Sequence, residues 1–236
     1  MTEVVFIRHG QASAGSDNYD QLSPLGRQQA ELLGSWIAQH GAGFDRVVVG
    51  RMARHRATLD AIEAACAAAA IALPAAEVMA EFDEFDHHQV LLAYAGRRGS
   101  PLAGAKGGSH AASKEDLKAM YLGLRAALYA WTGGELEPHL DEPYAAFQQR
   151  VRRGADQLGQ GKERERVLVV SSGGVASQWA QHALGFDNRR AAEMNLTLRN
   201  SAISEFRLIE GAWNLMSWNS LPHLGAPGQR GMWTYY

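Results

Sequence analysis

The chain has 236 residues, of which 46% are hydrophobic and 20% charged, and its formal net charge is −2. This length and composition fit one globular α/β domain. The net charge excludes the basic excess that drives non-specific nucleic-acid binding, so an anionic ligand would have to be held by a local cluster of positive groups.

Cysteine content and hydrophobic runs indicate the compartment. The single cysteine, Cys66, allows no disulfide within the chain, which favours a reducing environment. The apolar run Val4–Ile7 is too short for a signal peptide, and the Ala-rich stretch 61–72 is too short to span a membrane. We therefore expect a cytoplasmic protein with neither a membrane nor a nucleic acid as partner. The sequence leaves the oligomeric state open.

The first half of the chain alternates between strand and helix patterns. Short continuous runs of β-branched residues are typical of strands buried on both faces. Ser23 suits the N-cap of the first helix, and Pro24 suits its first position. In chain order, the predicted elements are a strand at Val4–Ile7, a helix from Pro24 to the glycines at 41 and 43, a strand at Val47–Val49, a helix over 52–70 and a strand at Val78–Phe82.

The second half begins with an irregular segment, from about 87 to 140, which we interpret as an insertion over the sheet. Its Gly-rich stretch 96–109 is predicted to be a mobile loop that acts as a lid. The later elements are helices at Lys114–Trp131 and Pro143–Leu158, a strand at Val167–Val170, a turn at 171–174 into a helix ending near Leu184, and a hairpin of Ile203–Ile209 with Trp213–Trp218. This order predicts a single domain, 1–236, with a three-layer α/β fold and a mainly parallel central sheet covered by helices on both faces.

Three of the predicted strands are followed by residues suited to phosphate chemistry. Arg8 and His9 follow the first strand, Arg54 lies one helical turn after the second, and Ser171–Gly174 follow the strand at Val167–Val170. The carboxyl ends of parallel strands meet at one edge of a sheet, so these residues should converge. A histidine is a good nucleophile toward phosphorus, arginines hold phosphate oxygens, and a helix N-terminus adds amide donors.

Several motifs, in order, resemble one known family. The tetrapeptide Arg8-His9-Gly10-Gln11 after an N-terminal strand resembles the signature of the histidine phosphatase superfamily, which includes the cofactor-dependent phosphoglycerate mutases. The segment 50–58, Gly-Arg-Met-Ala-Arg-His-Arg-Ala-Thr, resembles the family motif Ser-Pro-Leu-x-Arg-x-x-x-Thr. The segment 18–30 is similar to the family's approach to its first helix, and the segments 200–203 and 219–224 are similar to its closing strands.

The resemblance implies a site and an activity. His9 would be the phosphorylated nucleophile, and Arg8 and Arg54 would hold the phosphate. The acid would be a glutamate after the third strand: Phe82-Asp83-Glu84 resembles the mutase motif Leu-Asn-Glu and favours Glu84, and Glu81 is the second candidate. The implied protein is a phosphomonoester hydrolase acting on a small phosphorylated substrate, with no metal and no cofactor. The alternatives are a phosphoglycerate mutase-type phosphotransferase and a catalytically impaired phosphate-binding or interaction protein on the same fold.

The sequence departs from the family pattern at one important position. The family's fourth strand ends in Ser-His-Gly, whereas this chain has Ser171-Ser172-Gly173. Losing a charged donor to the transition state costs roughly 10²–10³ in rate, by analogy with oxyanion-hole deletions. The expected phosphate contacts are Gly10, Asn18, Ser172, Gly173 and His87. We hypothesise that His87 or its neighbour His88 supplies the missing charge.

Overall fold

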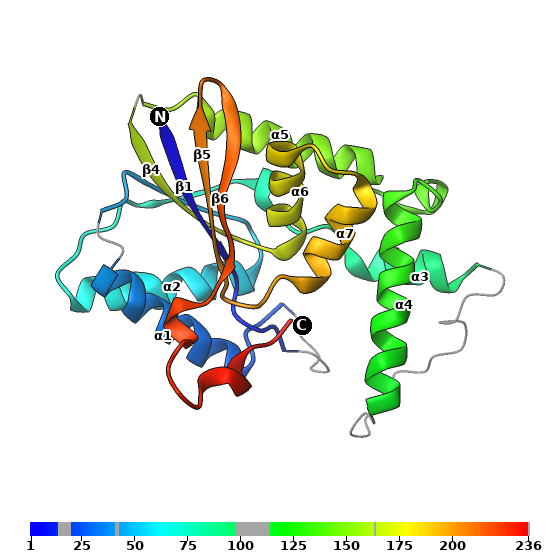
Figure 1. Cartoon of the computed structure of the whole chain (residues 1–236), viewed down its shortest axis with the longest axis horizontal. Coiled ribbons are helices and arrows are strands. Elements are labelled where there is room, and N and C mark those ends of the chain that lie inside the picture. The colour runs from blue at the N-terminus through cyan, green and yellow to red at the C-terminus, as the bar shows by residue number, and fades with distance from the viewer. Residues whose placement is uncertain (14–19, 41–42, 98–113, 163, 236) are drawn as a thin grey trace.

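The computed structural model describes residues 1–13, 20–40, 43–97, 114–162 and 164–235. Within these residues, a six-stranded sheet has the order β3-β2-β4-β1-β5-β6 (Figure 1). The strands are β1 (Thr2–Arg8), β2 (Arg46–Val49), β3 (Ala76–Val78), β4 (Glu165–Ser171), β5 (Ile203–Ile209) and β6 (Ala212–Ser220). Strands β1 to β4 pair in parallel, and β5 and β6 extend the sheet by antiparallel pairing.

Helices cover both faces of this sheet. The first face packs against α1 (Pro24–His40) and α2 (Ala53–Ala68), and the second against α5 (Tyr144–Gly159) and α6 (Gly173–Leu184). Helix α7 (Asn188–Thr197) follows α6 and packs against it. Helices α3 (His87–Ala95) and α4 (Lys114–Thr132) lie to one side of the sheet (Figure 1). The predicted three-layer α/β fold with a mainly parallel sheet is therefore confirmed.

The alternation of side chains along β1 explains its continuous apolar run. Val5 and Ile7 pack into the cluster under α1 and α2, whereas Val4 and Phe6 pack into the larger cluster under α5 and α6. All four side chains are buried, because successive residues of a strand point to opposite faces and both faces are covered.

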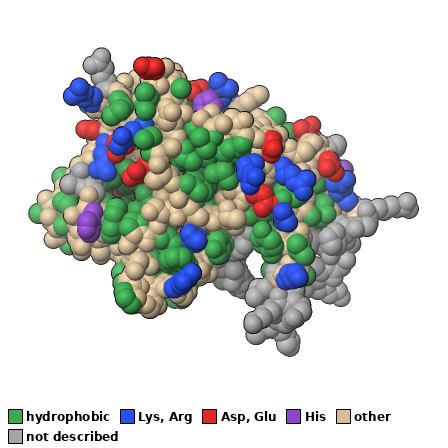
Figure 2. Space-filling model, viewed as in Figure 1, with side chains coloured by type: hydrophobic (Ala, Val, Ile, Leu, Met, Phe, Trp, Pro, Cys, Tyr) green, Lys and Arg blue, Asp and Glu red, His purple; other side chains and the backbone are tan. Residues whose placement is uncertain are grey.

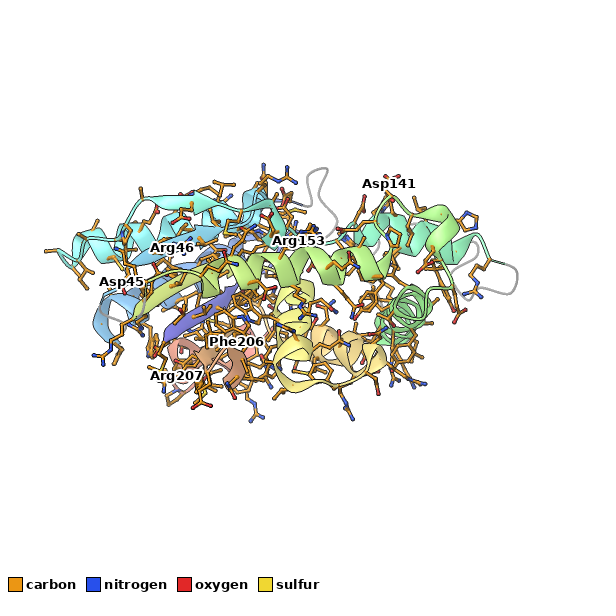
Figure 3. The ribbon with its side chains drawn as sticks, turned by 90° about the horizontal axis from the view of Figure 1, so that it is seen from above. Asp45, Arg46, Asp141, Arg153, Phe206 and Arg207 are labelled. Atoms are coloured by element: carbon orange, nitrogen blue, oxygen red, sulfur yellow. The ribbon has the colours of Figure 1, made fainter. Side chains whose placement is uncertain are left out.

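The opposite ends of the parallel strands face different surroundings. Figure 3 labels Asp45 and Arg46 at the amino end of β2, and Asp141, which precedes α5, on the other side of the molecule. Arg46 pairs there with Glu77 at 2.8 Å and with Glu165 at 3.4 Å, so these charged groups at the amino end are paired with one another. The carboxyl ends of the strands are left for the candidate site.

The predicted third strand was placed too late in the sequence. Strand β3 covers Ala76–Val78, and Ala80–Phe82 form a 3-10 turn instead of a strand. The chain turns here because Phe82 enters the core and stacks on Trp179, with ring centroids 5.6 Å apart. The carbonyl of Phe82 accepts a hydrogen bond from the hydroxyl of Ser171, which fixes the turn beside the end of β4.

Two helices, α3 and α7, were not predicted. Both begin at an aspartate N-cap, because Asp86 accepts hydrogen bonds from His88 and Gln89, and Asp187 accepts one from Arg190. Most of the predicted lid, the Gly-rich stretch 96–109, lies outside the described residues. Among the described helices, none is both long and apolar enough to cross a membrane.

The surface near α4 and α7 carries charges of both signs. Figure 2 shows basic and acidic side chains intermingled on this face. One ion pair joins the two helices, since Arg125 of α4 donates to Glu193 of α7 at 2.6 Å. Arg189 of α7 also lies over the ring of Tyr129 of α4, 4.3 Å from its centroid. These contacts hold α4 against the rest of the domain.

Trp179 is central to the larger core cluster. Its ring stacks on Phe82 and Phe206 and meets the edges of Phe6 and Trp213, with centroid distances of 5.0–6.1 Å. We expect Trp179→Ala to lower the free energy of unfolding by about 3–5 kcal/mol, because the cavity left behind cannot collapse among so many rings. Urea denaturation measures this, with Trp36→Ala, a half-buried position on α1, as the control that should lose clearly less.

Candidate active site

His9 lies at the carboxyl edge of the sheet, immediately after β1. Arg8 is in register with Ser171 of the neighbouring β4. The amide of His9 donates to the carbonyl of Ser171 at 2.9 Å, and its carbonyl accepts from the amide of Ser201 at 3.0 Å. The backbone of His9 is therefore fixed between the ends of β4 and the loop before β5.

The hydrogen bonds of the His9 ring define its tautomer. Nδ1 lies 2.6 Å from the carbonyl oxygen of Gly10, which can only accept, so the ring hydrogen is on Nδ1. Nε2 consequently carries a lone pair, toward which the Nε of Arg54 donates at 3.2 Å. Burial, with the nearby charges of Arg54 and Arg8, holds the pKa of His9 well below its ordinary value. The ring is therefore neutral and presents a nucleophilic nitrogen.

Two buried guanidinium groups lie beside this nitrogen. Arg54, the second residue of α2, is 4% exposed and donates to a carboxylate oxygen of Asp20 at 2.7 Å. Arg8 is 8% exposed and donates to the carbonyl oxygens of Leu198 and Tyr235. The two arginines lie on different elements, and the edge of the sheet brings them together. They form a local positive cluster although the net charge of the chain is negative.

Glu84 supplies a carboxyl group to the same place. Its Oε2 accepts the amide hydrogen of Gly174, near the start of α6, at 3.0 Å. Burial raises the pKa of Glu84, although the Gly174 amide and the charge of Arg54 act in the opposite direction. A carboxyl group in such surroundings is suited to donating and taking back a proton.

The structure distinguishes the two acid candidates by position. Glu84 lines the cavity at the sheet edge, together with His9 and both arginines. Glu81 does not line it; its Cβ lies against Gly154 of α5, with no room for a larger residue there. Of the two glutamates, Glu84 is the one beside His9.

The cavity has a volume of about 80 Å³ and two kinds of wall. One wall is charged and comes from the ends of β1, α2 and the segment before α3. The other is apolar with two amide side chains, and comes from α4, α7 and the segment before β5. The lining residues are Arg8, His9, Ala12, Arg54, Glu84, Phe85, His87, Leu124, Leu128, Asn195, Leu196 and Asn200.

The predicted phosphate contacts are dispersed. His87, the first residue of α3, lines the cavity, whereas Asn18 lies outside the described residues. The amide of Gly10 donates to the hydroxyl of Thr58 at 3.1 Å. Gly173 is packed so closely that a Cβ on it would lie 2.5 Å from the side-chain oxygen of Asn195. The hydroxyl of Ser172 lies 2.5 Å from Nε2 of His55, and neither of these side chains lines the cavity.

Three residues near the site were missed in the sequence. Asn195 is on α7, a helix whose pattern was too polar to be predicted. Asn200 is in the segment 200–203, which carries part of the family resemblance but contains no motif that assigns Asn200 to the site. His55 follows Arg54 directly, and its burial beside Ser172 has no signal in the sequence.

Comparisons with solved structures agree with this fold. The alpha-ribazole phosphatase from Shigella flexneri is 19% identical, with 92% of this chain and 96% of that chain covered and a TM-score of 0.61. A mycobacterial glucosyl-3-phosphoglycerate phosphatase is 18% identical, with coverage of 92% and 98% and a TM-score of 0.61. A phosphoglycerate mutase from Bacillus anthracis is 14% identical, with coverage of 94% for both chains and a TM-score of 0.61.

At these identities the structural matches show a shared fold. A search of curated proteins found no match. A family model describes most of the sequence: that of the histidine phosphatase superfamily (branch 1) matches residues 4–90 and 107–221, which include the Arg8-His9-Gly10 motif, Arg54 and Glu84. The chain therefore belongs to the histidine phosphatase superfamily.

Proposed function

We propose that this protein is a phosphomonoester hydrolase that acts through a phosphohistidine intermediate on His9. The observation that carries the proposal is the hydrogen bonding of the His9 ring. Its Nδ1 hydrogen is held by the carbonyl of Gly10, and its Nε2 lone pair lies at a cavity shared with two arginines and a carboxyl group. Phosphatases of the same superfamily share the fold, which supports the assignment.

In the first step, Arg8 and Arg54 hold the phosphoryl oxygens, and Nε2 of His9 attacks phosphorus. The new N–P bond forms as the bond to the leaving oxygen breaks. Glu84 gives its proton to that oxygen, so the alcohol departs neutral. The guanidinium of Arg54 turns from Nε2 to the phosphoryl group, whose developing charge both arginines stabilise. The Gly10 carbonyl stabilises the positive charge of the phosphorylated ring.

In the second step, water releases the phosphate. The carboxylate of Glu84 takes a proton from water as the water oxygen attacks phosphorus and the N–P bond breaks. Inorganic phosphate is the product, and His9 returns to its neutral form. The leaving group would contact the apolar wall of Leu124, Leu128 and Leu196, which favours an aryl or other largely apolar alcohol over a carboxylate-bearing one.

The nucleophile is tested by labelling. We expect the protein to hydrolyse 4-nitrophenyl phosphate and, after acid-free quenching, to carry a phosphoryl group that acid removes. His9→Ala should lose both turnover and label, because the lone pair of Nε2 that attacks phosphorus is then absent. His182→Ala, on α6 and away from the cavity, is the control and should keep both. Turnover that persists in His9→Ala would contradict the proposed nucleophile.

The acid is tested by a matched pair of glutamates. With phenyl phosphate, whose leaving oxygen is basic enough to need a proton, Glu84→Gln should lower the rate of phosphohistidine formation by about 10²–10⁴-fold, the usual contribution of a general acid. Glu81→Gln should leave the rate within about twofold, since that side chain does not reach the cavity. Rapid-quench measurement of the labelled protein gives both rates, and equal losses in the two variants would exclude Glu84 from this role.

The pH dependence follows from the same carboxyl group. Burial raises the pKa of Glu84, and the acid acts only while protonated, so phosphohistidine formation should fall as pH rises through this raised pKa. Because the pKa of His9 is held well below its ordinary value, His9 should stay neutral and active on the acid side of pH 6.5. In Glu84→Gln, a pH–rate profile should lack the alkaline fall; if the fall is unchanged, another group causes it.

A further inference from the structure

A second imidazole is buried beside His9. His55, one residue after Arg54 on α2, has no exposed surface, and its ring centroid lies 5.6 Å from that of His9, with the planes tilted by 34°. Its Nε2 lies 2.5 Å from the hydroxyl oxygen of Ser172, which is equally buried. The steps proposed above use neither residue, yet both lie directly behind the cavity wall that His9 forms.

The space for this imidazole depends on a glycine. A Cβ on Gly50, at the end of β2, would lie 2.5 Å from Nδ1 of His55 and 2.5 Å from the carbonyl oxygen of Phe82. Such distances are shorter than any real carbon contact. Gly50, His55 and Ser172 lie on separate segments that meet here. The imidazole ring fits only because position 50 has no side chain.

Ser172 lies between the backbone contacts of the nucleophile and those of the acid. The residue before it, Ser171, accepts the amide hydrogen of His9 at 2.9 Å. Two residues after it, the amide of Gly174 donates to Glu84 at 3.0 Å. Ser172 itself is the N-cap residue of α6. A shift of Ser172 would therefore move both catalytic partners.

We propose that His55 is a positioning residue that, through Ser172, fixes His9 and Glu84 relative to each other for phosphoryl transfer. The inference rests on the proposed function and names a residue outside its chemical steps. His55 packs against the ring of His9 on one side and hydrogen-bonds to the α6 N-cap on the other, so it joins the two halves of the site. Burial, with the charge of Arg54, holds the pKa of His55 well below its ordinary value, so the ring adds no charge there.

A matched pair of substitutions separates hydrogen bonding from packing. His55→Leu fills most of the space but leaves the buried hydroxyl of Ser172 without its partner. His55→Gln keeps a polar group near the position of Nε2. We expect His55→Leu to lower kcat for 4-nitrophenyl phosphate by about 100-fold, the scale of a misplacement of about 1 Å, with KM nearly unchanged. His55→Gln should recover most of this loss.

The pH profile gives a readout that a purely structural role would not move. The amide of Gly174 lowers the pKa of Glu84, so loosening the start of α6 in His55→Leu should shift the alkaline limb to higher pH. The charged groups that face Glu84 are Arg8 of β1, Arg54 of α2 and Arg150 of α5, and the titratable groups that share its cavity are His9 and His87; neither variant substitutes any of these residues. Circular dichroism and thermal unfolding should show that both variants are folded.

A second variant guards against a Gln side chain that fits poorly. In a double-mutant cycle on the contact of His55 with Ser172, Ser172→Ala should lower kcat about as much as His55→Leu, and the double variant should lose no more than either single variant. The inference is overturned if His55→Leu keeps the wild-type kcat and alkaline limb, or if His55→Gln recovers no activity and the losses in His55→Leu and Ser172→Ala simply add in the double variant. If the wild-type protein shows neither turnover nor label, the proposed function itself fails. The inference about His55 fails in a protein that still turns over, so the two failures are distinct.

Discussion

Parallel pairing of β1 with β4 places Arg8 opposite Ser171, and the rest of the site depends on this register. The amide of His9 then meets the carbonyl of Ser171, and α6 begins beside His9. A shift of one residue would turn every side chain of β1 to the opposite face of the sheet and remove Arg8 and His9 from the cavity. The apolar run of β1 does not by itself fix the register, because both faces of the strand are buried and apolar side chains fit either face. The hydrogen bonds of the His9 backbone, beyond the end of the strand, fix it.

The site concentrates positive charge in a chain whose formal net charge is −2. Arg8 and Arg54 are nearly buried and are held by the carbonyl oxygens of Leu198 and Tyr235 and by the carboxylate of Asp20. Burying such groups is costly unless they are paired, so an anion between them is favourable. The same burial lowers the pKa of His9 and raises that of Glu84. One environment thus favours the neutral imidazole of His9 and the protonated carboxyl group of Glu84, which are the forms that the proposed first step uses.

Much of the fold was predictable, because its central strands are short apolar runs. Two of them are followed directly by recognisable residues, the Arg8-His9-Gly10 motif and Ser171–Gly174. The N-cap at Ser23 also fixed the start of α1, and its hydroxyl accepts the amide hydrogen of Gly26 at 2.9 Å. The sequence predicts the third strand too late because an apolar residue such as Phe82 is equally typical of a strand. In the structure, Phe82 instead stacks on Trp179 in the core. The polar helix α7 offered no apolar periodicity to detect.

The candidate site was predictable by residue type but not by contact. Arg8, His9, Arg54, Glu84 and His87 all line one cavity. The choice of Glu84 over Glu81 required the direction of each side chain after the 3-10 turn. The contact of His55 with Ser172 required the close approach of α2 to the end of β4, which depends on the missing Cβ of Gly50. No periodicity or motif in one sequence reports a distance of this kind.

The most direct test of the account is to locate the phosphoryl group on the protein. With histidine labelled with ¹⁵N and the protein held at its phosphorylated stage by rapid mixing with an aryl phosphate, nuclear magnetic resonance detects the coupling between phosphorus and a ring nitrogen. The account predicts coupling to Nε2 of His9, since Nδ1 is engaged by Gly10. Phosphorus on Nδ1, on another residue, or on no residue of a protein that still turns over would contradict it.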